Sequence, residues 1–308
     1  MKKKAAAIKK FELDSALHRL HKGGLVKSDF GMDNSNELIG GGFGLYSTAD
    51  LKGDIGPAKT EYYRISLTKA GAVTMDVGLE TFHPTQNSIV FGFPGQVFSL
   101  YEPSKDFFAY YLLFKEGFIP GSLMMKNSRE PFPFLGYTGV QCFQLNKEEV
   151  TEVEALILKI DHEIKKRKPG ISRIIQLYIQ LILLQADRSY ERQALAKQET
   201  AVHGNALFTR FVKLVSRDFL TRRKVADYAA LLHVSSDHLN RTIKSQSKKT
   251  AHELINEMIL VEAKAHLLRT ELSIAEISYQ LEFTDPSHFN KFFKKLTGCT
   301  PLQYRAKS

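Results

Sequence analysis

Two short stretches near the C-terminal end of the chain carry polar side chains at helical spacing. One stretch offers Asp237, His238, Arg241 and Lys244, and the other offers Ser287, Asn290, Lys291 and Lys294. At 100° per residue, each set falls opposite the apolar residues of its stretch. Lysine donates hydrogen bonds to guanine edges or phosphates, and asparagine pairs with an adenine edge through two hydrogen bonds. These residue types therefore suit contact with a DNA major groove.

The two stretches belong to an internal repeat. Residues 235–250 align with residues 285–300 at an offset of 50 positions. Upstream, residues 225–227 align with residues 274–276 at an offset of 49, so the second copy carries one extra residue in its turn. Two copies of one small helical unit are the simplest explanation of this pattern.

Helix-start chemistry locates the elements that must position these side chains. Ser273 and Thr250 are each followed three residues later by Glu, the pattern of a capping box. Asp285 before Pro286 suits an N-cap followed by the first helical position. The predicted helices are 225–232, 236–245, 251–268, 274–281 and 286–297. Their expected inward residues are Leu239 and Ile243 in the second and Phe289, Phe292, Phe293 and Leu296 in the last. The order predicts two helix-turn-helix units joined by a long helix.

Residues 205–308 resemble the DNA-binding domain of the AraC family of bacterial transcription regulators. The resemblance is carried by Ile274-Ala275-Glu276-Ile277-Ser278, Phe283, residues 285–294, Gly298, Thr300-Pro301 and Tyr304-Arg305. It implies seven helices, with two recognition helices that enter successive major grooves about 10 base pairs apart. By position, it implies base-proximal roles for Asp237, Asn240, Arg241, Ser287, His288, Asn290 and Lys291. It also implies an activator that contacts RNA polymerase.

Two residues depart from the pattern of that family. Glu282 stands in the second turn where glycine is usual, and Lys248 replaces the glycine expected after the first recognition helix. A slight shift of a helix is expected at either position. Asp237 is a poor neighbour for phosphate, so the first helix either reads a cytosine amino group or contributes less than the second.

The first half of the chain alternates with the period of a β-strand. Apolar residues at 63, 65 and 67 and again at 73, 75, 77 and 79 predict two half-buried strands, with a turn at residues 69–71. Further short apolar runs separated by Pro and Gly predict a sandwich or barrel. The predicted fold class is therefore α+β with several domains: a cupin-like β-barrel at 1–148, a helical dimerisation pair and linker at 149–202, and an all-α DNA-binding domain at 203–308.

The family often joins its DNA-binding domain to a cupin-type barrel, and residues 30–185 are compatible with that plan. An effector pocket in this barrel has as candidates Tyr62, Tyr63, Phe82, His83, Phe91 and Phe93, for which a core role is the alternative. Only Glu80 and His83 approach metal-ligand spacing, so no metal and no cofactor are expected. A cupin-type enzyme with a basic tail is the alternative function, and a binder without sequence preference is another.

Two helices with apolar stripes follow the strands. Residues 153–164 and 171–182 each show spacings of three and four. The second stripe either packs on its own domain or forms a homodimer seam. Residues 187–203 have the polar composition of a linker.

Charge is uneven along the chain, whose net charge is +10. Residues 203–308 hold 17 Lys and Arg against 10 Asp and Glu, while residues 1–202 hold 26 against 23. This excess favours polyanion binding and double-stranded DNA as the partner. No segment has the length of a membrane helix, and residues 1–10 lack the apolar core of a signal peptide, so a cytoplasmic protein is expected. Cys142 and Cys299 are far apart and predict neither a disulfide nor a zinc site.

Overall fold

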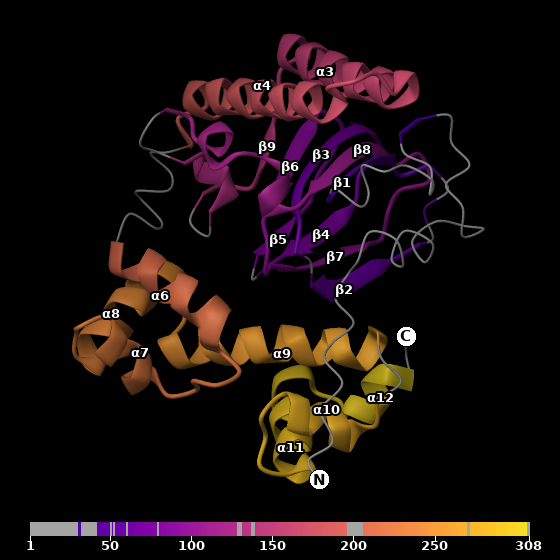
Figure 1. The fold of residues 1–308 in the computed structure, drawn as a ribbon. Coiled ribbons are helices and arrows are strands. Elements are labelled where there is room, and N and C mark those ends of the chain that lie inside the picture. Colours follow the sequence, from indigo (N-terminus) through magenta and orange to yellow (C-terminus); the bar gives the residue numbers. More distant parts are fainter. Residues whose placement is uncertain are drawn as a thin grey trace.

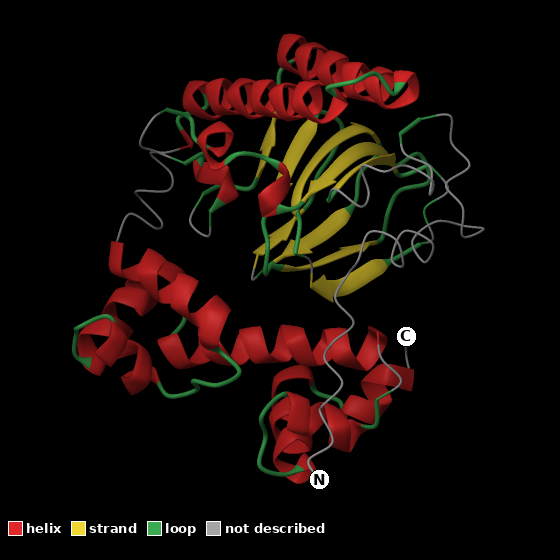
Figure 2. Ribbon diagram, viewed as in Figure 1, coloured by secondary structure: helices red, strands yellow, loops and turns green. Residues whose placement is uncertain are grey.

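The computed structural model has an N-terminal part built on β-sheets and a helical C-terminal part (Figures 1 and 2). The structure describes residues 30–31, 42–49, 51, 53–59, 61–78, 80–127, 131–136, 139–195, 206–269 and 272–306. The order of strands followed by helices confirms the predicted α+β class with several domains. The expectation that no signal peptide is present concerns residues 1–10, which lie outside the described residues. In the described part of the chain, none of the helices is long and apolar enough to cross a membrane.

In the described ranges, nine antiparallel strands form two sheets. The first sheet, in the order β1-β8-β3-β6-β9, comprises β1 (Phe43–Ser47), β3 (Tyr63–Ala70), β6 (Ser88–Gly92), β8 (Phe108–Phe114) and β9 (Cys142–Gln144). The second, in the order β2-β7-β4-β5, comprises β2 (Ile55–Lys59), β4 (Thr74–Val77), β5 (Glu80–Phe82) and β7 (Val97–Tyr101). Three 3-10 turns lie between β8 and β9, at Glu116–Phe118, Gly121–Met124 and Pro133–Leu135.

The predicted barrel is not closed. Within the described ranges, no ladder of hydrogen bonds joins an edge strand of one sheet to an edge strand of the other. The edge strands β5 and β9 have only three residues each, and β2 loses its register between Ile55 and Ala58. Short or irregular edges offer few groups for continued pairing. The strands therefore form two facing sheets instead of one continuous barrel.

Helices α3 (Lys147–Lys166) and α4 (Ile171–Arg192) cover the outer face of the five-stranded sheet (Figure 1). Ile157 and Ile175 are fully buried in one core with Ile65 and Leu67 of β3. Most of the predicted stripe of α4 therefore packs on its own domain. Its Leu181 differs, because 46% of this residue is exposed.

The predicted linker begins later than expected. Helix α4 continues through Arg192, so residues 187–192 are helical. The cause is tertiary packing. Tyr190 is buried against the rings of Phe134 and Phe143, and its hydroxyl accepts a hydrogen bond from the Val140 backbone N–H at 3.0 Å. Residues 196–203 of the predicted linker lie outside the described residues.

The C-terminal helices match the predicted order closely. They are α6 (Ala206–Asp218), α7 (Val225–Leu231), α8 (Ser236–Ser247), α9 (Ala251–Arg269), α10 (Ile274–Gln280), α11 (Pro286–Thr297) and α12 (Pro301–Ala306). Helices α6 to α8 and the first half of α9 share one core, while the second half of α9 and α10 to α12 share another. Helix α9 thus connects two small helical units (Figure 1).

Candidate nucleic-acid interface

The first helical unit is α7, a tight turn and α8. His233 adopts a left-handed φ of 58° in the turn, and the Ser235 hydroxyl then accepts a hydrogen bond from the His238 backbone N–H at 3.2 Å. This bond satisfies one of the free N–H groups at the start of α8. Leu239 and Ile243 are completely buried, as predicted, and hold α8 on its core. The opposite face of α8 is therefore left at the surface.

The second unit repeats this arrangement with α10 and α11. The predicted capping box is present, because Ser273 accepts from the Glu276 N–H and the Glu276 carboxylate accepts from the Ser273 N–H at 2.9 Å. An Asp285 carboxylate oxygen accepts from the backbone N–H groups of Ser287 (2.7 Å) and His288 (3.1 Å). The bond from His288 is the largest cause of the lowered pKa of Asp285. The N-cap at Asp285 thus starts α11 at the residue that the sequence predicted.

The two departures from the family pattern occupy positions where glycine is conformationally favoured. Glu282 has a φ of 56° and Lys248 a φ of 61°, both in the left-handed region. A residue with a side chain adopts that conformation at a cost of about 1–2 kcal/mol. Both turns are retained, and α11 spans the predicted residues, so the substitutions are accommodated in the backbone of the turn.

Most predicted contact residues are exposed on α8 and α11. Eight side chains reach the surface in equivalent positions of the two units, namely Asp237, His238, Arg241, Lys244, Ser287, His288, Lys291 and Lys294. The two asparagines differ from them. Asn240 and Asn290 are half-buried, and their side chains bond the Ala251 N–H (3.3 Å) and the Pro286 carbonyl (2.9 Å). The eight exposed side chains therefore form the more accessible part of the candidate surface.

The inward face of α11 is narrower than predicted. Phe289 and Phe293 are completely buried and Phe292 is partly buried, whereas Leu296 is 41% exposed. The prediction of Leu296 as an inward residue was wrong. The ring of Tyr304 from α12 packs against Phe293, with the ring centres 5.4 Å apart, so a later helix contributes to the core under α11.

Arginines from distant segments hold the helices of the C-terminal part together. A guanidinium nitrogen of Arg223, which precedes α7, donates to the Leu281 carbonyl at the end of α10. The same guanidinium lies 4.2 Å from the ring centre of Phe283. At the other end of α9, Arg305 donates to the carbonyls of Leu267 (3.1 Å) and Leu272 (2.7 Å). These contacts satisfy carbonyl groups that a helix end leaves free.

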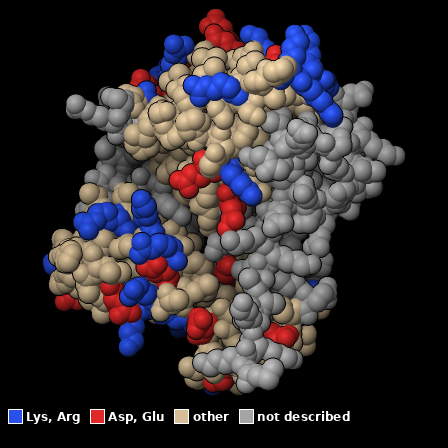
Figure 3. Space-filling view, viewed as in Figure 1, with Lys and Arg blue, Asp and Glu red and all other residues tan. Residues whose placement is uncertain are grey.

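Lys and Arg side chains gather on the lobe formed by α6 to α8, together with some acidic ones (Figure 3). Lysines at 244, 248 and 249 are all exposed at and just after the end of α8. Lys244 lies in the last turn of α8, where a cation is favoured, and the ammonium group of Lys249 pairs with Glu257 of α9 at 2.7 Å. Lys248 and Lys249 were not among the predicted contact residues, although their charge and position after α8 mark them in the sequence.

The six predicted effector residues do not form one site. Tyr62, Phe91 and Phe93 are buried, and the Tyr63 ring stacks on Phe114 with ring centres 5.3 Å apart. Phe82 is half-buried on edge strand β5, and His83 is exposed, with its Nδ1 atom 3.4 Å from the Thr74 hydroxyl. None of the six lines the cavity between the sheets and the helical part or the smaller cavity beside Arg64. The buried ones, Tyr62, Phe91 and Phe93, pack in the interior.

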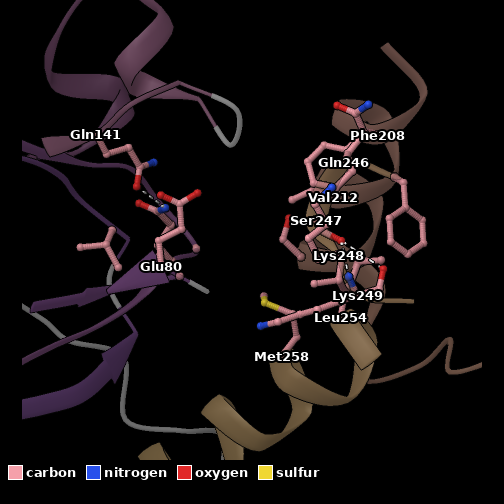
Figure 4. A pocket seen from close by; sticks show the side chains of 17 residues that line it. Glu80, Gln141, Phe208, Val212, Gln246, Ser247, Lys248, Lys249, Leu254 and Met258 are labelled. Carbon is pink, nitrogen blue, oxygen red and sulfur yellow. Dashed lines mark hydrogen bonds between the residues drawn. The ribbon is translucent and has the colours of Figure 1, made fainter. Parts of the chain in front are cut away.

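A cavity of about 450 Å³ lies between the sheets and the helical part of the chain. Figure 4 shows Glu80 and Gln141 on one wall facing side chains of the helical part across the space. The facing wall is apolar at Phe208, Val212 and Met258 and basic at Lys248 and Lys249. Strand residues and helix residues thus share one cavity.

Neither cysteine nor metal chemistry is evident in the described ranges. No group of three or more His, Cys, Asp and Glu in those ranges is placed to hold a metal ion. Both cysteines are free thiols, and burial raises the pKa of Cys142 to about 12. A thiol with so high a pKa is not a reactive nucleophile near neutral pH.

A model of a helix-turn-helix domain matches residues 228–307. The uncharacterized transcriptional regulatory protein YesN of Bacillus subtilis is 26% identical over 110 residues, which are 34% of this chain and 30% of YesN. The transcriptional activator RhaR of an Enterobacter strain is 20% identical over 171 residues, 55% of this chain and 59% of RhaR. The bifunctional transcriptional activator and DNA repair enzyme AdaA of B. subtilis is 29% identical over 94 residues, 30% of this chain and 44% of AdaA. The matches span less than two thirds of each relative.

Among solved structures, the chain is similar to ToxT of Vibrio cholerae with a bound unsaturated fatty acid. The TM-score is 0.45 at 17% identity, and the similarity covers 85% of this chain and 94% of ToxT. It is also similar to the C-terminal domain of AraT, a response regulator of Geobacillus stearothermophilus, with a TM-score of 0.33 at 28% identity. That match covers 34% of this chain and 87% of the other.

Proposed function

We propose that this chain is a transcription regulator of the AraC type, which reads two adjacent major grooves of duplex DNA with the two helix-turn-helix units of its C-terminal part. The observation that carries the proposal is the equivalence of α8 and α11. Each follows a short helix and a turn, buries two apolar residues, and exposes a charged and polar face. One such helix fits one major groove, and two on a rigid connection read two.

The proposed DNA contacts are the exposed side chains at 237, 238, 241, 244, 287, 288, 291 and 294, with the half-buried Asn240 and Asn290 beside them. The sequence-similar regulators and the basic C-terminal third support this assignment. We further propose activation through RNA polymerase, dimerisation, residence in the cytoplasm, and control by an effector in the N-terminal part. The proposed domains are residues 1–148, 149–202 and 203–308.

Footprinting of the purified full chain tests the proposal. The probe is the DNA upstream of its own gene, at physiological salt and with random competitor DNA. We expect protection on one face of the duplex in two patches about 10 base pairs apart, because consecutive major grooves recur once per turn. Equal affinity for random duplex would contradict sequence-specific binding and support a binder without sequence preference.

A further inference from the structure

The inner face of the two-sheet domain is polar along β3. Ile65 and Leu67 join the core under α3 and α4. Arg64, Ser66 and Thr68 alternate with them and are therefore directed to the other face of the strand. These three are nevertheless buried, because the second sheet covers that face. Burying the polar face of such a strand costs free energy unless its polar groups find hydrogen-bond or charge partners.

Arg64 carries the charge on this face, so its guanidinium needs a hydrogen-bond or charge partner. The residue is 6% exposed, and its guanidinium carbon lies 4.2 Å from the ring centre of Phe98 on β7 in the facing sheet. Its Nε atom is buried and has no hydrogen-bond partner in the described part of the chain. Burial lowers the pKa of Arg64 to about 10, so the side chain still carries its positive charge at neutral pH. Contact with one aromatic ring offsets only part of the cost of burying a cation.

Arg64 lines a small cavity between the sheets. The cavity has a volume of about 50 Å³. One water molecule needs roughly 10–15 Å³, so the space holds about three to five non-hydrogen atoms, and propionate, with five, is at the upper end. Ser66, Thr68 and Tyr111 add hydroxyl groups to its wall, while Ile55 and Met75 are among the apolar side chains that make up the rest. The site thus combines one cation with a few hydroxyl groups in apolar surroundings.

We propose that this cavity binds a short-chain monocarboxylate, with the carboxylate against Arg64 and a short apolar tail among the side chains of the second sheet. A carboxylate matches the planar donor geometry of a guanidinium. A phosphate dianion fits less well, because a single cation in an apolar cavity leaves half of its charge unpaired. The ligand is a candidate for the effector of the proposed regulator, and only this regulatory role depends on the proposed function.

The position of the cavity gives its ligand a physical connection to the DNA-binding part. Strand β4 contributes Met75 to this cavity and Val77 to the larger one beside the helices. The segment leading through β7 likewise contributes Gln96 to the larger cavity and Phe98 to the smaller one. A ligand that orders these two strands also orders one wall of the space that faces α6 and α9.

The first test is direct binding to the full chain at pH 7.5. Calorimetric titration and thermal unfolding are measured with propionate, with 1-propanol as the uncharged probe of similar size, and with inorganic phosphate. We expect saturable binding and a raised Tm with propionate alone. Arg64→Met is expected to weaken propionate binding at least about tenfold, because a hydrogen-bonded charge pair is lost. Arg173→Met, which removes an exposed arginine of α4, is the matched control and should bind as the unchanged protein does.

A second readout keeps the test decisive if Arg64→Met changes the fold. Without ligand, Arg64→Met should have a higher Tm, because a buried unpaired cation is removed. Arg64→Lys retains the charge and should bind propionate with an intermediate affinity. Equal binding of propionate and 1-propanol, preference for phosphate, or unchanged propionate affinity of Arg64→Met would each overturn the proposal. These results are independent of the footprint, so a failed carboxylate site and failed DNA recognition are distinguishable.

Discussion

The predicted contact residues on α8 and α11 differ in how accessible their side chains are to DNA. Arg241 and Lys291 occupy equivalent positions, one on each helix, and both are exposed. Their neighbours Asn240 and Asn290 are half-buried, and each side chain bonds to the backbone of its own domain. Either asparagine would have to break its hydrogen bond to the backbone before it could pair with adenine. The two basic residues therefore offer the clearest test of direct base contact.

We predict that Lys291→Ala and Arg241→Ala each weaken specific DNA binding by about 1–3 kcal/mol, because each loses contacts to a base edge or phosphate. The measurement is a titration against the footprinted site and against random duplex, with Tm as the check on folding. Lys159→Ala, which removes an exposed charge of α3 in the N-terminal part of the chain, is the control. Unchanged affinity in both variants would refute the assigned faces.

At the scale of elements, the turns and the long helix α9 fix how the two recognition helices face DNA. Caps at Ser235, Ser273 and Asp285 set where three helices begin. These caps act within three residues and do not orient one unit against the other. That orientation depends on contacts between distant segments, and Arg223 makes two of them, to the Leu281 carbonyl and the Phe283 ring.

Arg223→Met tests this orienting role. We expect a loss of about 1–3 kcal/mol in the free energy of unfolding, since a charged hydrogen bond and a cation–π contact are removed. Specific DNA binding should weaken as well, with protection reduced to one of the two patches. The neighbouring Arg222→Met is the control. Arg222 is largely exposed, with its nearest nitrogen 3.5 Å from Asp218, and such a pair contributes about 0–1 kcal/mol. Full two-patch protection by Arg223→Met would contradict the role.

At the scale of the whole molecule, the helix pair α3 and α4 keeps large apolar side chains exposed. Leu158 of α3 and Leu177 and Leu181 of α4 are 45%, 42% and 46% exposed, although most of the predicted stripe packs on its own domain. A homodimer formed through this helix pair would cover them. The proposed seam is therefore the outer side of α4, a quarter turn or more away from the buried positions 175 and 182.

We predict that the unchanged protein sediments as a dimer at micromolar concentration and that Leu181→Glu sediments as a monomer, because a charge in the seam would be buried without a partner. Leu302→Glu provides the matched control. Leu302 is 66% exposed on α12, so the same change there should leave the dimer intact. A monomeric unchanged protein, or a dimeric Leu181→Glu variant, would count against this seam.

The sequence by itself determined the helical C-terminal part almost completely. The repeat, the caps and the apolar spacing act within one or two turns of a helix, so they predicted α7 to α11 to within two residues at each end and placed Arg241 and Lys291 at the surface. Leu296 is the exception, because it is 41% exposed, and a ring from another helix, Tyr304, packs against Phe293 of the same helix.

Only the tertiary structure decided how the N-terminal strands are used. Period-two alternation in β3 predicted one buried face and one solvated face, yet a second sheet covers the polar face and buries Arg64 beside Phe98, 34 positions along the chain. Alternation records which residues share a face of a strand but not what covers that face. Which sheet closes over Arg64, and that a cavity remains there, depends on pairing between distant strands, for which the local sequence carries no signal.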